Sequence, residues 1–142
     1  MEDFDMGLDS LLKELQEEFN IAPRKHIIAV DDDRNVLKLI KDFLGDKYEV
    51  TTMANGLMAL NYFRNKTCDL IFLDYEMPGM SGADVLKKLR ENENTKDIPV
   101  VFLTGVSDNQ KVKEIMSMGV HDYILKPINV ERLRADAKKI LG

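Results

Sequence analysis

The 142-residue chain contains one cysteine, two histidines and no tryptophan. A single cysteine, Cys68, excludes a disulfide within the chain, and one cysteine with two histidines does not make a zinc site. Such cysteine usage is typical of a reducing cytoplasm, which is the compartment that we expect. The longest apolar stretches, 27–30 and 100–103, fall far short of the roughly 20 residues that span a bilayer. The acidic N-terminus also lacks the basic region and apolar run of a secretory signal.

The sequence has no excess of basic residues that would indicate binding to nucleic acid. Its formal net charge is −5, and residues 1–24 hold seven acidic side chains against Lys13 and Arg24. Residues 25–142 carry as many basic as acidic side chains, so that part is neutral. We therefore expect neither direct nucleic-acid binding nor membrane attachment.

After residue 24, short apolar runs alternate with segments of helical periodicity. The runs cover residues 26–30, 48–53, 69–73, 98–103 and 123–125. The helical patterns cover residues 36–44, 57–63, 85–89, 112–116 and 130–141, with Gly45 at an expected C-cap. This alternation predicts an α/β fold, with five parallel strands covered by helices on both faces. We take residues 25–142 as one domain.

Polar side chains with reactive groups occupy the carboxyl ends of the predicted strands. They are Asp31, Asp32, Asp33, Asp74, Thr104 and Lys126. Ligands of open parallel sheets bind at this edge, so we expect these groups to lie together. Several carboxylates in one place repel each other unless a divalent cation is bound, and an all-oxygen site favours Mg²⁺. A carboxylate beside Mg²⁺ can attack phosphorus, with the ion, Lys126 and Thr104 offsetting charge on the transferred group.

Four motifs in register resemble the receiver domains of bacterial response regulators, the CheY-like family. The motifs are the acidic run 30–33, the segment 72–82 around Asp74, Thr104-Gly105 and Lys126-Pro127. Each alone is weak, but four in the right order over residues 25–142 are specific. The resemblance implies a flavodoxin-like (βα)5 fold with strand order 2-1-3-4-5, and a cis bond before Pro127.

The resemblance also implies a role for each matching residue in a two-component phosphorelay. Asp74 accepts a phosphoryl group from a histidine kinase, and Asp31, Asp32, Asp74 and the backbone carbonyl of Glu76 hold Mg²⁺. The phosphoryl group contacts Lys126 and Thr104. Thr104 and Tyr123 then act as a switch that changes the surface of the fourth helix, fifth strand and fifth helix for a partner protein or an output domain. Asp33 is expected to cap the first helix of the domain.

The main alternative is a Mg-dependent phosphatase of the haloacid dehalogenase type, which also uses an Asp nucleophile. Glu76 stands two residues after Asp74, as the second acid does in those enzymes. Against this, such enzymes place the nucleophile on the first strand, whereas Asp74 follows the third. A flavodoxin-like cofactor carrier is disfavoured because three acids after the first strand would repel a phosphate. An inactive scaffold is disfavoured because the set of site residues is complete.

Residues 1–24 lie outside the receiver pattern and form an acidic extension. Leu8, Leu11, Leu12, Leu15 and Phe19 make one apolar stripe at helical spacing. We expect a helix that begins near Asp9 or Ser10 and has ended before Pro23. It would pack on its own domain, connect to an upstream domain, or mediate docking or a homodimer, and the stripe alone does not decide between these.

Overall fold

A computed structural model describes residues 4–18 and 23–142 of the chain. The elements follow in the order α1 (Phe4–Glu18), β1 (His26–Val30), α2 (Arg34–Leu44), β2 (Glu49–Met53), α3 (Gly56–Tyr62), β3 (Leu70–Asp74), α4 (Gly82–Glu91), β4 (Val100–Thr104), α5 (Asn109–Ser117), β5 (Asp122–Leu125) and α6 (Val130–Leu141). The predicted alternation of five strands and five helices is confirmed, and strand ends differ from the predicted ones by one or two residues.

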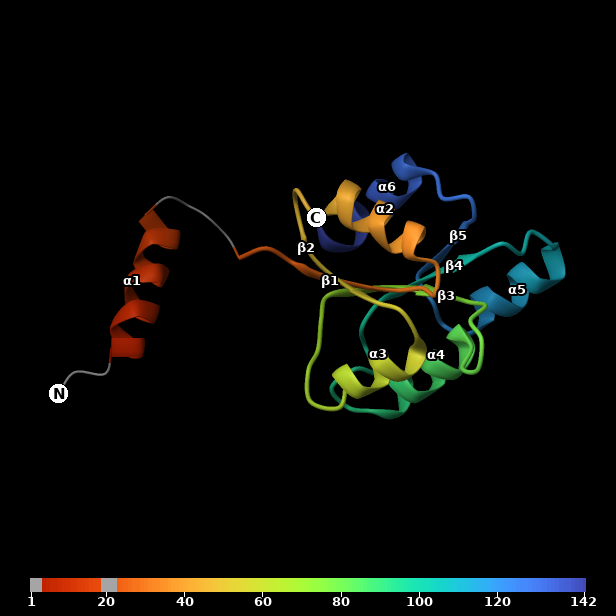
Figure 1. Ribbon diagram of the computed structural model, residues 1–142, viewed down its shortest axis with the longest axis horizontal. Helices are drawn as coiled ribbons and strands as arrows, with labels where there is room; N and C mark the ends of the chain where they lie inside the picture. The colour runs from red at the N-terminus through yellow and green to blue at the C-terminus, as the bar shows by residue number, and fades with distance from the viewer. Residues whose placement is uncertain (1–3, 19–22) are drawn as a thin grey trace.

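The strands form one parallel sheet in the order β2-β1-β3-β4-β5, as the family resemblance implied. Helices α2 and α6 cover one face, and α3, α4 and α5 cover the other (Figure 1). Successive strand residues point to opposite faces, so each central strand feeds two cores. In β1, Ile28 and Val30 join the core under α3 and α4, while Ile27 and Ala29 face α2 and α6.

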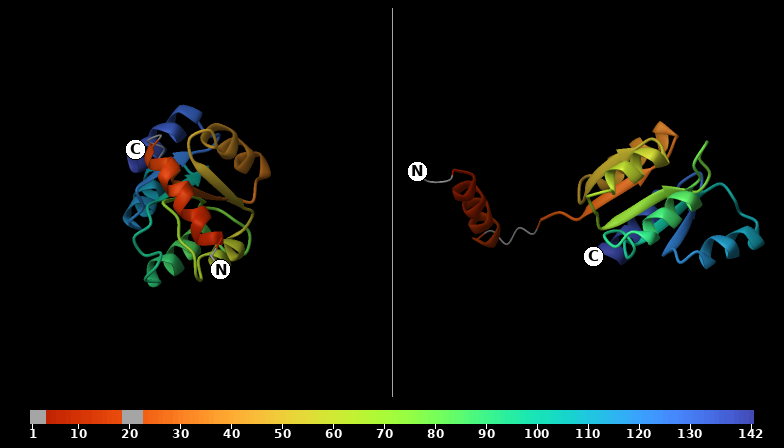
Figure 2. Two further views of the ribbon diagram at one scale, coloured as in Figure 1. Left: turned by 90° about the vertical axis from the view of Figure 1, so that its left-hand side faces the viewer. Right: turned by 90° about the horizontal axis from the view of Figure 1, so that it is seen from below.

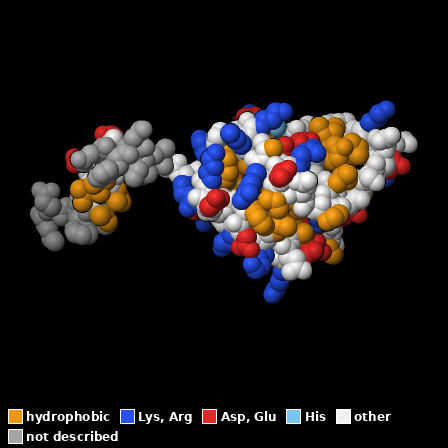
Figure 3. All heavy atoms as spheres, turned by 90° about the horizontal axis from the view of Figure 1, so that it is seen from above, with side chains coloured by type: hydrophobic (Ala, Val, Ile, Leu, Met, Phe, Trp, Pro, Cys, Tyr) orange, Lys and Arg blue, Asp and Glu red, His pale blue; other side chains and the backbone are white. Residues whose placement is uncertain are grey.

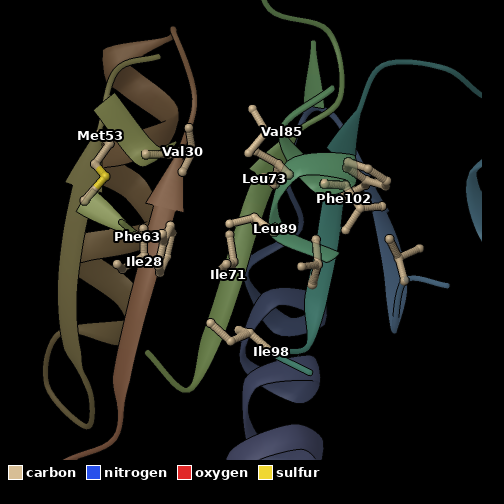
Figure 4. Close-up of a cluster of buried hydrophobic side chains, with 14 of the residues drawn as sticks. Ile28, Val30, Met53, Phe63, Ile71, Leu73, Val85, Leu89, Ile98 and Phe102 are labelled. Carbon is tan, nitrogen blue, oxygen red and sulfur yellow. The ribbon is translucent and has the colours of Figure 1, made fainter. Parts of the chain in front are cut away.

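Both cores consist of fully buried aliphatic and aromatic side chains. Figure 4 shows the first, in which Phe63 from the end of α3 and Leu89 from α4 pack over Ile28 and Ile71. In the second, Phe72 of β3 lies among side chains of α2 and α6. Because a buried Phe truncated to Ala typically costs about 3–5 kcal/mol, this double core holds the central strands in place. A rigid β3 fixes the position of Asp74, its last residue.

Polar caps start the helices just after the loops at the carboxyl edge of the sheet. The five N-caps of α2 to α6 are Asp33, Asn55, Ser81, Asp108 and Asn129, and each side chain accepts a hydrogen bond from a backbone N–H in the first helical turn. The prediction for Asp33 is therefore confirmed. Ser81 and Asp84 complete a capping box at the start of α4.

Helix α1 differs from its prediction in where it begins. It starts at Phe4, so Asp9 and Ser10 lie inside the helix and the prediction that either caps it is wrong. The helix ends at Glu18, before Pro23, and Phe19 lies outside the described residues. Leu8, Leu11, Leu12 and Leu15 are all exposed, and α1 stands apart from the sheet (Figures 1 and 2). Within residues 4–18 and 23–142, no helix is long and apolar enough to cross a bilayer.

Candidate functional site

The register of the sheet brings the predicted site residues to one edge. Asp74 ends β3 and Thr104 ends β4, while Asp31 and Lys126 directly follow β1 and β5. Val30 pairs with Leu73, so the next residues along, Asp31 and Asp74, are neighbours across the ladder. The sequence-based prediction that these side chains meet agrees with this geometry.

Three carboxylates form the centre of the site. Asp31, Asp32 and Asp74 each offer an oxygen, and these atoms lie within 4.8 Å of one another. Asp31 and Asp74 are buried, with 0% and 2% of their surface exposed, whereas Asp32 faces solvent. An all-oxygen set that is open on one side suits a hard cation that keeps several waters, as Mg²⁺ does. The residues present therefore fit the Mg²⁺ ion that the family resemblance implied.

Lys126 provides the one ammonium close to these acids among the described residues. Its Nζ lies 2.9 Å from Asp31 Oδ2 and 3.2 Å from Asp74 Oδ1. Asp31 Oδ1 accepts a hydrogen bond from the Asp33 N–H at 2.9 Å, but Asp31 Oδ2 has no well-aligned donor despite the nearby ammonium. Asp31 therefore keeps an acceptor oxygen with remaining capacity, as a metal ligand requires.

The environment shifts the pKa of two of these groups. Burial, followed by the negative charge of Asp31 and a hydrogen bond with Asp32, raises the pKa of Asp74 to about 7, although Lys126 opposes the shift. Burial alone would lower the pKa of Lys126, but its contacts with Asp31 and Asp74 outweigh burial and raise that pKa. Lys126 is thus held in its charged form beside an acid whose charge costs free energy.

Thr104, at the end of the neighbouring strand β4, and Glu76, two residues after Asp74, also lie beside this acid. The Thr104 hydroxyl donates to Glu76 Oε1 at 3.3 Å and accepts from the Val106 N–H at 3.0 Å. The Glu76 N–H donates to Asp74 Oδ1 at 3.3 Å. These bonds place a hydroxyl and a backbone N–H next to the acid, where both could contact an added group. The structure does not bring the Glu76 side chain into the carboxylate cluster.

Two residues near the site had no role in the sequence-based prediction. Gly82 begins α4, and a Cβ there would lie 2.3 Å from the Asp74 carbonyl oxygen, so only glycine lets α4 approach the end of β3 this closely. Arg132 of α6 donates to Asp122 Oδ2 at 2.8 Å and to the Tyr123 carbonyl at 2.9 Å. The guanidinium also lies 6.0 Å from the centre of the Tyr123 ring. The Gly82 signal was visible inside the segment 72–82, whereas the Arg132 contacts depend on how α6 packs on β5.

Tyr123 and Pro127 lie where the resemblance implied. Tyr123 is half-buried on β5, next to the core under α4 and α5. The bond between Lys126 and Pro127 is cis. Thr104, at the end of the neighbouring β4, pairs with Leu125, so the hydroxyl and the ring belong to adjacent strands.

Comparisons with known proteins agree with this architecture. The family model of the response regulator receiver domain matches residues 27–138. The two-component response regulator ARR17 of Arabidopsis thaliana is 33% identical over 144 residues, covering 90% of each chain. Chemotaxis protein CheY-3 of Vibrio cholerae is 34% identical over 116 residues, covering 80% of this chain and 89% of that protein. The chain spans 62% of the length of another relative, the response regulator ARR7 of Arabidopsis thaliana.

Solved structures show the same fold. The chemotaxis response regulator CheY4 of Vibrio cholerae superposes with a TM-score of 0.78 and 30% identity, covering 84% of this chain and all of that one. The receiver domain of DrrB, solved as its BeF3-activated form, gives a TM-score of 0.76 at 31% identity and covers 84% of this chain. From the match over residues 27–138 and these relatives, the chain belongs to the response regulator receiver domain family of two-component signalling.

Proposed function

We propose that this chain is a phosphoacceptor switch in which the Asp74 carboxylate receives a phosphoryl group from the phosphohistidine of a sensor histidine kinase or phosphotransfer protein. The observation that carries the proposal is the position of Asp74. It ends the middle strand 3.2 Å from the Lys126 ammonium, with an oxygen within 4.8 Å of those of Asp31 and Asp32. An acid in that position can approach phosphorus while neighbouring groups offset the charge of the phosphoryl oxygens.

In the proposed transfer, one Asp74 oxygen forms a bond to phosphorus as the bond from phosphorus to the histidine nitrogen breaks. The electron pair of that broken bond stays on the imidazole, which takes up a proton. Lys126 and Thr104 contact the phosphoryl oxygens, and Asp74 must be ionised to attack. The pKa of Asp74 is raised to about 7 even with Lys126 beside it, so a bound cation would further favour the ionised form that attacks.

Asp31, Asp32, Asp74 and the backbone carbonyl of Glu76 would hold a Mg²⁺ ion. When bound, the ion neutralises charge on the carboxylates and on the phosphoryl group. Two observations favour this assignment: Asp31 Oδ2 is buried without a well-aligned hydrogen-bond donor, and Asp32 is exposed to solvent. No other cofactor is proposed.

The proposed switch begins at the Thr104 hydroxyl, which contacts Glu76 in this structure. The hydroxyl is bonded to Glu76 Oε1, so contact with a phosphoryl group on Asp74 requires that bond to be exchanged. Tyr123 on the adjacent strand then changes rotamer, and the surface of α5, β5 and α6 changes its affinity for a downstream protein or output domain. The chain acts as a regulator whose chemistry is limited to accepting the phosphoryl group and slowly losing it.

The dehalogenase-type phosphatase gains no support as an alternative. The carboxylate of Glu76, which would serve as its second acid, is engaged by the Thr104 hydroxyl and lies outside the carboxylate cluster. Asp74 stands on the third strand and not the first.

We further propose that residues 25–142 are the receiver domain and residues 1–24 an added helical extension.

The test is phosphorylation by acetyl phosphate with Mg²⁺, followed by intact mass spectrometry. The native chain should gain one phosphoryl group, and Asp74→Asn should gain none. Asp136→Asn serves as the matched control, because it removes a buried acid on α6 that has no proposed role in the reaction. If Asp74→Asn gained the group at the native rate, Asp74 would not be the acceptor. Multiple turnover of a small phosphate ester would favour the phosphatase.

A further inference from the structure

Helix α1 presents an apolar stripe that no other element covers among the described residues. Leu8, Leu11, Leu12 and Leu15 recur at helical spacing and are all exposed. Figure 3 shows a hydrophobic patch on α1. With 3.6 residues per turn, Asp9 and Glu14 flank the stripe on opposite sides. The stripe therefore has an acidic border on both sides.

Helix α1 is a poor candidate for folding alone or for pairing with a second α1. A helix of 15 residues is marginal in water without tertiary contacts. Its last turn carries Glu17 and Glu18 but no basic residue, which is unfavourable at the negative end of the helix dipole. The segment holds five acids and only Lys13 as a base, so two copies side by side would repel each other. A basic apolar surface would suit it better.

The receiver body offers such a surface at α3. A hollow of about 680 Å³ is lined by Asn55, Leu57, Met58, Leu60, Asn61 and Arg64. Leu57 and Met58 are 69% and 49% exposed, although Leu57 begins the apolar helical pattern of residues 57–63. Only Ala59, Gly56 and the flanking Phe63 are buried here, so α3 turns two large apolar side chains outward. The lining of this hollow includes no residue of the carboxylate cluster.

The border of this hollow carries the opposite charge to that of α1. Arg64, two residues after the end of α3, lines it, and an adjoining hollow that shares Met58 is lined by Arg34, Lys38 and Lys41 of α2. Leucines flanked by acids thus match exposed Leu57 and Met58 flanked by bases. Apolar burial would drive such a contact, and the charges would set its orientation.

We propose that α1, which stands apart from the sheet in this structure, docks on the α3 hollow of its own chain, with its leucine stripe on Leu57 and Met58. Arg24 donates hydrogen bonds to the carbonyls of Gly45 and Tyr48, so the connection between α1 and the fixed body is residues 19–22, which span about 18 Å at most when extended, at up to 3.6 Å per residue. The chain then leads into His26, whose ring lies 6.4 Å from that of Tyr62 in the last turn of α3. The hollow is therefore within reach, and a tether this short gives an effective concentration in the millimolar range. The proposal does not depend on phosphorylation of Asp74.

Cross-linking of the full chain tests this directly. In a Cys68→Ser background, Leu11→Cys is combined with Met58→Cys, or with the control Met116→Cys on α5, which is similarly exposed at 40%. A short bis-maleimide is applied to dilute protein. We expect a link within one chain that forms about tenfold faster with the cysteine at position 58, as the tethered docking implies. Arg64→Glu should slow that link, whereas Lys113→Glu on α5 should not.

Three results would overturn the proposal. Equal rates at positions 58 and 116 would show that α1 has no preferred site, and the absence of a link at either position would show that it does not dock. A link at position 58 that forms only between two chains would assign the hollow to the α1 of a second copy. Light scattering on the unmodified protein adds an independent measurement, because in-chain docking predicts the mass of a monomer.

Discussion

This domain carries two clusters in which acidic side chains surround one basic side chain, Lys126 in the first and Arg132 in the second, and the clusters differ in their environment. The first comprises Asp31, Asp74 and Lys126 at the carboxyl edge, and the second comprises Asp122, Arg132 and Asp136 on β5 and α6. In each, burial raises the pKa of one acid, to about 7 for Asp74 and about 6 for Asp136. A raised pKa therefore does not identify the functional site here.

The difference lies in the number of carboxylates and in the open position of one of them. The first cluster adds a third acid, Asp32, that is open to solvent, so it can admit a cation and a phosphoryl group. In the second, Arg132 joins Asp122 at 2.8 Å and reaches Asp136 at 3.9 Å, and its guanidinium also binds the Tyr123 carbonyl. We interpret the second cluster as a structural connection between β5 and α6. The following predictions test this contrast.

The largest expected effect comes from removing the cation of each cluster in turn. Lys126→Met should slow phosphorylation by acetyl phosphate by about 100-fold, since losing one well-placed donor typically costs 10²–10³ in rate. Arg132→Met should leave that rate within about twofold, because Arg132 does not touch the proposed reacting atoms. The measurement is the initial rate by mass spectrometry at saturating Mg²⁺. Equal losses in the two variants would remove the distinction between the clusters.

A smaller effect is expected on stability when Mg²⁺ is added. A ligand that binds only the folded state at ten times its Kd stabilises by about 1.4 kcal/mol, which thermal unfolding can detect. Asp32→Asn should lose most of this stabilisation, and Asp136→Asn should keep it. NaCl at matched ionic strength is the control for screening. If Asp32→Asn responded to Mg²⁺ as the native chain does, the ion would bind elsewhere.

The smallest predicted effect concerns pH and the second cluster. Burial, a hydrogen bond with Asp122 and the charge of Asp122 raise the pKa of Asp136 to about 6. An acid with a raised folded pKa holds its proton more tightly when folded, so its favourable contribution is complete at low pH. That contribution is lost as the pH rises from about 4 towards 6. For Asp122, burial acts to raise the pKa, but the hydrogen bond from Arg132 outweighs burial and the pKa is lowered. Asp122 therefore gains a favourable contribution as the pH rises, which partly offsets the contribution lost by Asp136.

The variant Asp136→Asn should remove that dependence. Between pH 4 and pH 7 its unfolding free energy should fall by about 1 kcal/mol less than that of the native chain. At about 1.4 kcal/mol per pKa unit, the raised pKa of Asp136 alone would give about 3 kcal/mol at most, and the neighbouring Asp122 titrates together with it, which reduces the effect of removing one acid. Urea titrations across this range provide the measurement. Asp46→Asn, at an exposed position, is the control and should retain the native profile. An unchanged profile in Asp136→Asn would contradict the assigned shift.

The carboxylate edge could be predicted from the sequence because it depends on local patterns. Apolar runs of strand length mark β1, β3 and β4, and the next residue on a parallel strand falls at a shared edge. Asp31, Asp74, Thr104 and Lys126 follow from that rule alone. The cap at Asp33 follows equally from its place between a strand and a helix.

What could not be predicted depends on how separate elements pack. Leu57 fits a helical stripe, yet Gly56 and Ala59 provide the close face of α3 and leave Leu57 in solvent. The Arg132 contacts require the placement of α6 on β5, which periodicity does not give. The start of α1 was misplaced because Asp9 and Ser10 are good caps by residue type, whereas the helical pattern extends back to Phe4.

The most direct measurement locates the phosphoryl group on the chain. Borohydride reduces an aspartyl phosphate to homoserine, which peptide mass spectrometry identifies by position. After reaction with acetyl phosphate and Mg²⁺, the account predicts homoserine at position 74 alone, with Asp31, Asp32 and Asp136 unchanged. Homoserine at any of those three positions, or a phosphorylated chain that yields none, would contradict it.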